Sequence, residues 1–210
     1  VVLYFRRDWA SMIGGFVAHV FRGVPYEKDS PTGASGRLFV PVLVACIPAA
    51  IVGFLWDDFI ETRLRHWYWV AGSLVLIALV MYAAEKIGQK KRDIDHMNYV
   101  DYIGIGVAQA LALFPGVSRS GITISAGMFR GLDRAAAARF SFLLSTPIIL
   151  GAGAKKMMDV MDAGLASGEA MVFAVGFVSA AASGYLAIRF LMNYLQNRTL
   201  NVFVVYRIAF

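Results

Sequence analysis

The sequence is poor in the residues on which soluble and secreted domains depend. Only 16% of its 210 residues are charged, whereas a water-soluble domain carries roughly 25%. It has a single cysteine, Cys46, which lies within an apolar run, so a disulfide framework is excluded and the redox compartment stays open. With 59% hydrophobic residues and a mean hydropathy of +0.62, the composition indicates an integral membrane protein.

The positive net charge of +6 does not indicate a nucleic-acid partner. The basic residues fall in short segments between apolar runs, which is typical of the cytoplasmic loops of membrane proteins. We therefore expect membrane lipids around the protein and no nucleic acid.

Four apolar segments are long enough to cross a bilayer, which takes about 20 residues. They are residues 38–56, 67–84, 135–154 and 171–192. The stretches VVLYFRR at the start and NVFVVYRIAF at the end look like parts of further membrane helices. The sequence thus predicts an all-α, polytopic helical bundle. We expect residues 1–210 to form a single membrane domain that is truncated at both ends.

Two further apolar runs, residues 102–114 and 122–129, are too short to cross the membrane. They flank a polar turn that begins at Pro115 and Gly116. Half-length segments around such a turn predict a re-entrant hairpin over residues 102–131. A hairpin of this kind is stable at membrane depth only where protein or a cavity surrounds it.

The distribution of Lys and Arg sets the expected orientation. Segments 6–37 and 85–101 are basic and are assigned to the cytoplasm, whereas segment 57–66 is acidic on balance and is assigned to the outside. The hairpin then enters from the cytoplasm and returns to it, and residues 155–169 form an outer loop. This order of hairpin, helix, loop and helix resembles half of an inverted repeat.

The turn of the hairpin, PGVSRSG, collects groups that donate hydrogen bonds to anions. A helix start offers free amides and the positive end of a dipole. Ser118 and Ser120 add hydroxyl groups, and Arg119 adds a planar fork of donors that matches phosphate oxygens. Thr123 and Ser125 extend the donor set by one turn. None of these groups is an obvious general base.

Other interpretations of these residues stay open. An arginine at membrane depth can pair with a carboxylate on another helix and hold the bundle together, although its flanking serines and glycines favour an anion site. Gln109 either bridges two helices by hydrogen bonding or reaches the ligand of the turn. Small residues recur every fourth position and predict close packing of the first half-helix: Gly104, Ala108 and Ala112, and Gly106 and Ala110.

Residues 115–147, PGVSRSGITISAGMFRGLDRAAAARFSFLLSTP, closely resemble the second motif region of the undecaprenyl-diphosphate phosphatase family, also called the bacitracin-resistance proteins. The stretches QALALFPG, FAVGFVSAAASGYLAIRFLMNYL and VVYR fit the same family. The resemblance implies an inverted repeat with two re-entrant hairpins that meet in the membrane, with a site open to the outer face. It also implies hydrolysis of undecaprenyl diphosphate to undecaprenyl phosphate in the bacterial plasma membrane, which recycles the lipid carrier for cell-wall synthesis.

The resemblance also assigns roles to particular residues. The family's motif arginine, taken to bind the diphosphate, falls on Arg119, its serines on Ser118 and Ser120, the following glycine on Gly121 and an upstream glutamine on Gln109. We take Arg119 and Ser118 as catalytic candidates, and we count Thr123 with the diphosphate-binding residues.

The family's N-terminal hairpin, with its glutamate-rich stretch and Pro-x-Ser-Ser-x-Gly-His motif, has no match in this sequence. The nucleophile and the acid and base are therefore not assigned. His19, His66 and His96 fall in predicted loops and are given no catalytic role.

The remaining expectations concern ligands, partners and alternatives. A divalent cation, Mg²⁺ or Ca²⁺, suits a diphosphate, but no ligand cluster for one is visible in the sequence. A homodimer is left open. The alternative from another class is an inverted-repeat transporter or lipid flippase for an anionic substrate, since such proteins combine broken helices with an anion site at the midplane. A structural membrane subunit would leave the polar turn unexplained.

Overall fold

The computed structural model describes residues 1–26, 36–64, 66–163 and 169–209. Within these residues the chain forms helices and no strand, which confirms the all-α fold class. The elements are α1 (Arg6–Arg22), η1 (Gly36–Leu38), α2 (Phe39–Arg63), α3 (Trp67–Ile87), η2 (Ile94–His96), α4 (Tyr99–Leu111), α5 (Arg119–Phe129), α6 (Arg134–Ala163), α7 (Glu169–Asn197) and α8 (Asn201–Ala209).

Four helices are long and apolar enough to cross a membrane. The candidate spans are Gly36–Trp56, Trp67–Ile87, Arg134–Asp162 and Ala170–Asn197. All four predicted spans are therefore confirmed as helices, and the chain is a multi-pass membrane protein. Pro48 and Pro147 lie inside α2 and α6 without ending them, as membrane helices allow when neighbouring groups satisfy the freed carbonyls.

The prediction that segments 6–37, 57–66 and 155–169 are loops is wrong in part, because helices extend into all three. α1 occupies much of segment 6–37 and carries His19, α2 continues to Arg63, and α6 continues to Ala163. The backbone hydrogen bonds of a helix need no apolar side chains, so hydropathy locates the apolar part of a helix and misses its polar ends. Residues 27–35 and 164–168 of these segments lie outside the described residues.

The two ends of the chain differ from each other. The first residues, predicted as the last turns of a helix, form turns that lead into the start of α1 at Arg6. The final stretch does form a helix, α8. Leu200 donates its backbone N–H to Glu85 of α3 at 3.2 Å, which ties the start of α8 to the end of α3.

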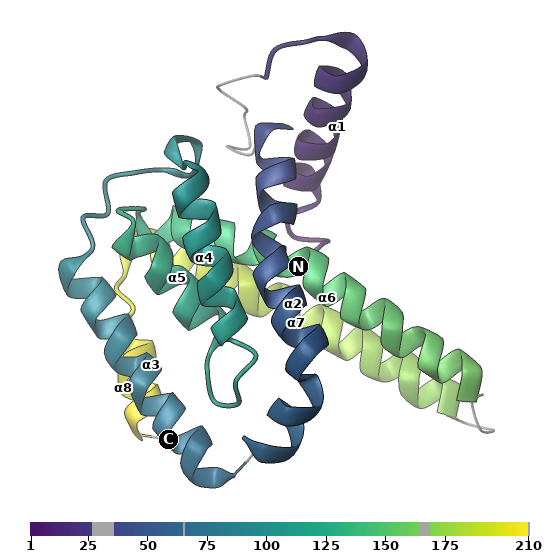
Figure 1. The fold of residues 1–210 in the computed structure, drawn as a ribbon, viewed down its shortest axis with the longest axis vertical. Helices are drawn as coiled ribbons and strands as arrows, with labels where there is room; N and C mark the ends of the chain where they lie inside the picture. Colours follow the sequence, from purple (N-terminus) through teal and green to yellow (C-terminus); the bar gives the residue numbers. More distant parts are fainter. Residues whose placement is uncertain (27–35, 65, 164–168, 210) are drawn as a thin grey trace.

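The short helices α4 and α5 lie at the centre of the bundle (Figure 1). α4 packs against α2, α5 packs against α3 and α6, and α8 packs against α3. The connection between α4 and α5 lies between α2 and α3, since Leu113 is next to Gly53 of α2 and Gly116 is next to Val70 of α3. Two half-length helices surrounded by longer ones are the arrangement that a re-entrant hairpin requires.

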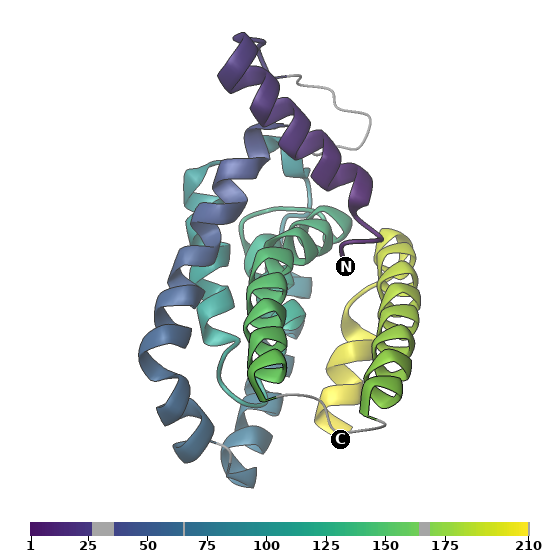
Figure 2. The same cartoon turned by 90° about the vertical axis from the view of Figure 1, so that its right-hand side faces the viewer.

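The periphery of the bundle is largely apolar and exposed. Only 6% of the apolar span in α7 is buried, against 50% of the span in α6. Figure 2 shows α7 at the edge of the bundle and α1 running obliquely across one end of it. Apolar side chains such as Phe177, which is 76% exposed, suit contact with lipid acyl chains.

The small residues of α4 do bring it close to α2. A Cβ atom added to Gly106 would lie 3.0 Å from the Cα atom of Ala45 and closer still to its carbonyl oxygen. Ala108 and Ala110 are buried as well. The packing prediction is confirmed for these residues and is wrong for Gly104, where an added Cβ meets nothing within 4 Å in the part of the chain that the structure describes.

We predict that Gly106→Ala destabilises the protein by about 1–3 kcal/mol, because the added methyl group forces α4 away from α2. Gly104→Ala is the matched control on the same helix. It should be neutral or stabilising by up to about 1 kcal/mol, since alanine is the better helix former. Thermal unfolding of the purified protein in detergent compares the two, and equal unfolding temperatures would contradict the described packing.

Candidate functional site

The turn between α4 and α5 takes its shape from Gly116. This residue has φ +85°, a left-handed conformation that glycine adopts without strain. An added Cβ would lie 2.5 Å from the carbonyl oxygen of Val70 and 3.0 Å from its Cα atom. Val117 donates its N–H to the carbonyl of Phe114 at 3.1 Å and closes the turn. The backbone therefore approaches α3 at a point where a side chain would not fit.

Ser118 caps the start of α5. Its Oγ accepts a hydrogen bond from the N–H of Gly121 at 3.1 Å, which leaves the hydroxyl proton of Ser118 able to donate elsewhere. Within the described residues, no hydrogen bond occupies the N–H groups of Arg119 and Ser120. Two amides and one hydroxyl proton are thus available at the positive end of α5.

The N–H of Gly121 is already bonded to Ser118, so it is not free to bind a ligand. Gly121 contributes to the site because it has no side chain. An added Cβ would lie 3.0 Å from both the Sδ atom of Met81 and the Oγ atom of Ser118. Glycine at this position allows α5 to pack closely on α3 while Ser118 keeps its capping geometry.

The half-buried arginines fall into two groups. Those in the first group have a carboxylate partner: Arg37 with Asp95 (3.5 Å), Arg92 with Asp101 (2.8 Å), Arg134 with Glu85 and Arg139 with Asp8. Arg119 and Arg207 form the second group, and neither has a carboxylate partner among residues 1–26, 36–64, 66–163 and 169–209. A half-buried guanidinium without a counter-charge is costly, which favours an anionic ligand for this second group.

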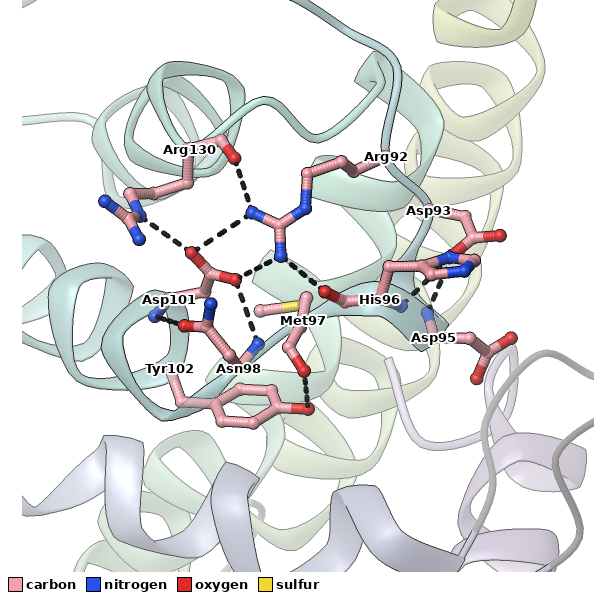
Figure 3. A network of polar contacts seen from close by, with 9 residues as sticks. All are labelled: Arg92, Asp93, Asp95, His96, Met97, Asn98, Asp101, Tyr102 and Arg130. Atoms are coloured by element: carbon pink, nitrogen blue, oxygen red, sulfur yellow. Dashed lines mark hydrogen bonds and ion pairs between the residues drawn. The ribbon is translucent and has the colours of Figure 1, made fainter.

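The contacts of Asp101 illustrate how a carboxylate neutralises arginines in this protein (Figure 3). Its buried carboxylate accepts hydrogen bonds from Arg92 at 2.8 Å, from Arg130 at 2.7 Å and from the backbone N–H of Asn98 at 2.9 Å. Burial alone would raise the pKa of Asp101, but these hydrogen bonds outweigh it and hold the pKa below its ordinary value. The cluster ties the start of α4 to the end of α5 and so fixes both arms of the turn.

We predict that Asp101→Asn destabilises the protein by about 2–3 kcal/mol at pH 7, because two arginines lose their shared acceptor. The pKa of Asp101 is lower in the folded state, so its stabilisation is fully present above the unfolded value of about 3.9 and is lost as pH falls through the folded value. Thermal unfolding in detergent should therefore show a constant difference between variant and wild type from about pH 5 to 8, and a shrinking one below about pH 4.

The matched control for this prediction is Asp159→Asn. Asp159 is exposed and faces Lys156 at 3.5 Å, a surface pair whose loss costs less than about 1 kcal/mol. If both variants unfolded at the same temperature, the Asp101 cluster would not hold the turn as described.

A cavity of about 190 Å³ opens beside the start of α5. Ser118, Ser120 and Gly121 line it together with Arg207 of α8. The rest of its lining is contributed by α3, α5, α7 and α8: Met81, Ile124, Leu191, Leu200, Phe203 and Tyr206. The cavity is thus polar at the start of α5 and at Arg207, and mostly apolar elsewhere. Its volume is below the roughly 300–1,000 Å³ of pockets that enclose whole ligands, so it suits a headgroup better than an entire lipid.

The structure brings only part of the predicted site into this cavity. Arg119 begins α5 beside the lining serines but is not itself among the lining residues. Thr123 is fully buried, with its hydroxyl 2.7 Å from the carbonyl of Arg119 and 2.6 Å from the hydroxyl of Ser141 on α6. Ser125 donates to the carbonyl of Gly121 at 2.7 Å. Both hydroxyls are engaged in packing α5.

Gln109 also lies away from the cavity lining. It is 2% exposed on α4, and neither atom of its amide has a hydrogen-bond partner in the described part of the chain. The expected bridge from Gln109 to another helix is therefore not formed within the described residues. Its role toward a ligand stays a prediction.

The sequence analysis missed Arg207 as a site residue. Its Nη2 atom donates to the carbonyl oxygen of Gly116 at 2.7 Å, so α8 contacts the turn directly. The signal was present in VVYR, a lone arginine in an apolar run, which is the same feature that singled out Arg119.

The described residues do not fit a protein-held metal ion. They contain no group of three or more His, Cys, Asp and Glu side chains that could hold one. Asp101 of α4 and Glu85 of α3 are both paired with arginines. The divalent cation expected from the sequence thus finds no ligand set among these residues.

The fold and site define a class: a multi-pass helical membrane protein. Its two short central helices, α4 and α5, are joined by a turn, and a cavity beside that turn is polar at one end only. Within this class the chain belongs to the bacitracin resistance protein BacA family, whose model matches residues 1–210.

Relatives from several bacteria are similar over nearly the whole chain. A protein of Rubrobacter xylanophilus is 44% identical over 209 residues, which cover 100% of this chain and 75% of the relative. A protein of Elusimicrobium minutum is 43% identical, with coverage of 100% and 74%, and one of Desulforudis audaxviator is 41% identical, with coverage of 99% and 74%. All three relatives are named undecaprenyl-diphosphatase. The chain spans about three-quarters of their length.

Proposed function

We propose that the protein hydrolyses undecaprenyl diphosphate to undecaprenyl phosphate and inorganic phosphate, and so recycles the lipid carrier for peptidoglycan synthesis. The observation that carries the proposal is the cavity at the start of α5. Its polar end offers the hydroxyls of Ser118 and Ser120 and the guanidinium of Arg207, and its apolar walls come from three other helices as well as α5. A diphosphate attached to a prenyl chain has the same division into a charged and an apolar part. The names of the relatives support the same substrate and a link to bacitracin resistance.

In this mechanism the turn grips the phosphate oxygens and stabilises charge while the anhydride bond breaks. Arg119, the free amides of Arg119 and Ser120, and the hydroxyl groups of Ser118 and Ser120 are the available donors. They are fixed before the reaction, so they need no reorganisation when charge develops on the leaving phosphate. The turn supplies no general base, so it is assigned to binding and charge stabilisation rather than to activating the nucleophile.

A divalent cation would not be held by the described residues, which offer no cluster of ligands. We propose that any Mg²⁺ or Ca²⁺ enters with the diphosphate oxygens, and no step is assigned to it. We further propose that the protein lies in the bacterial plasma membrane with its site open to the outer, periplasmic face, as the family resemblance implies. The distribution of basic segments supports the orientation of its spanning helices. A homodimer stays a prediction.

Phosphate release in detergent tests the proposed function. Purified full-length protein is incubated with undecaprenyl diphosphate, and inorganic phosphate is measured over time. An enzyme releases phosphate under these conditions, whereas a transporter or flippase releases none, because detergent removes the membrane and any gradient across it. Absence of phosphate release from properly folded protein would overturn the proposal.

A further inference from the structure

Arg207 has the contacts of a residue that faces a ligand as well as the protein. One of its donors, Nη2, holds the carbonyl oxygen of Gly116 at 2.7 Å. Its Nε atom is buried and has no hydrogen-bond partner within the described residues. Guanidinium carries five N–H donors and no acceptor. Its one hydrogen bond within the described residues therefore leaves most of these donors without a partner there.

Arg207 is placed at the cavity by the packing of its helix, α8. It lines the same cavity as Ser118 and Ser120 while its own helix, α8, packs on α3. Gly116 therefore lies against Val70 of α3, and its carbonyl oxygen accepts a hydrogen bond from Arg207 of α8. A guanidinium at this point can fix the turn and bind an anion in the cavity at the same time.

We infer that Arg207 is a second cation of the diphosphate site, contributed by α8 rather than by α5. This inference rests on the proposed function and adds to it a specific role for Arg207. Arg207 positions the turn through Gly116, and its remaining donors bind phosphate oxygens of the substrate alongside Ser118 and Ser120. A diphosphate carries oxygens on two phosphorus atoms, so donors from α5 and from α8 can engage it together.

The experiment measures kcat and KM for phosphate release from undecaprenyl diphosphate by wild type, Arg207→Ala and Arg207→Lys. Loss of a charge-assisted contact should lower kcat/KM of Arg207→Ala by about tenfold to a hundredfold, with a raised KM. Arg207→Lys should be intermediate, because lysine keeps the charge but not the fork of donors. Guanidinium ion at a non-denaturing concentration should restore part of the activity of Arg207→Ala, and urea at the same concentration should not.

Arg198→Ala is the matched control, since Arg198 is exposed at the end of α7 and does not line the cavity. It should behave as wild type. If Arg207→Ala kept its KM and gained nothing from guanidinium, Arg207 would only hold the turn and the inference would be overturned. If Arg207→Ala failed to fold, Arg207→Lys decides, and a KM equal to that of wild type would be the overturning result.

A second measurement separates this inference from the proposed function. Inorganic pyrophosphate should raise the unfolding temperature of wild type in detergent and should have less effect on Arg207→Lys. If wild type released no phosphate, the proposed function would be wrong. The change in unfolding temperature caused by pyrophosphate would still test whether Arg207 binds an anion. An equal shift in both proteins would overturn the assignment of Arg207 to the anion site.

Discussion

Replacing Arg119 with alanine should abolish measurable phosphate release from undecaprenyl diphosphate while the protein still inserts and folds. Arg119 is half-buried at the start of α5 and has no carboxylate partner within the described residues. Removing one preorganised donor from a site that stabilises developing charge costs about 10²–10³-fold in kcat. A full guanidinium fork at a phosphate removes more than one donor, so this loss is a lower bound.

The lack of a carboxylate partner for Arg119 also predicts how Arg119→Ala affects stability. No ion pair between described residues is lost, so the unfolding temperature in detergent should equal or exceed that of wild type. Arg139→Ala is the matched control, because Arg139 pairs with the buried carboxylate of Asp8 and its removal leaves that acid uncompensated. It should unfold at a lower temperature. Normal phosphate release by Arg119→Ala would contradict the assignment of Arg119 to the site.

The spans and the central short helices could be predicted from the sequence because their signals are local. Hydropathy over about 20 residues marks a spanning helix, and a proline followed by glycine after a short apolar run marks the turn. The ends of α2 and α6 could not be predicted in this way, since Arg63 and Ala163 lie beyond the apolar part of each helix. Polar residues continue a helix without leaving a hydropathy signal.

The orientation of side chains in the site depends on contacts between distant segments. Sequence alone placed Thr123 among the anion donors, one helical turn after Ser120. Its hydroxyl is instead hydrogen-bonded to Ser141 of α6, a contact that no local pattern reveals. Arg207 reaches the turn only because α8 packs on α3. Its alignment with the cavity is therefore a property of the fold.

Whether Arg119 is paired or free was left open by the sequence, since any of the chain's 14 acidic residues could have neutralised it. Among the described residues, the structure shows that other basic residues hold the acids that could have paired with Arg119. Glu85 is engaged by Arg134 and Lys90, Asp101 by Arg92 and Arg130, and Asp8 by Arg139. These three buried acids are thus already occupied, and Arg119 and Arg207 have no carboxylate partner in the described part of the chain, which favours an anionic ligand for them.

Gly116→Ala should cost both stability and activity, because it affects the turn on which Ser118 and Arg207 depend. Alanine at φ +85° is strained by about 1–2 kcal/mol, and its Cβ would lie 2.5 Å from the carbonyl oxygen of Val70. Relieving that overlap requires the backbone to move, at a further cost of about 1–3 kcal/mol. The movement also displaces the carbonyl that Arg207 holds, so kcat/KM for phosphate release should fall by at least about tenfold.

Gly23→Ala separates the effect of left-handed backbone strain from the effect of the overlap with α3. Gly23 ends α1 with φ +66°, and an added Cβ meets nothing within 4 Å among the described residues. This variant carries the conformational strain without the overlap, so its unfolding temperature should fall less than that of Gly116→Ala and its activity should stay at the wild-type level. Equal losses in both variants would mean that left-handed strain alone explains Gly116. In that case the contact between the turn and α3 would have no part in holding Ser118 and Arg119 at the cavity, and the geometry proposed for phosphate binding would lose its support.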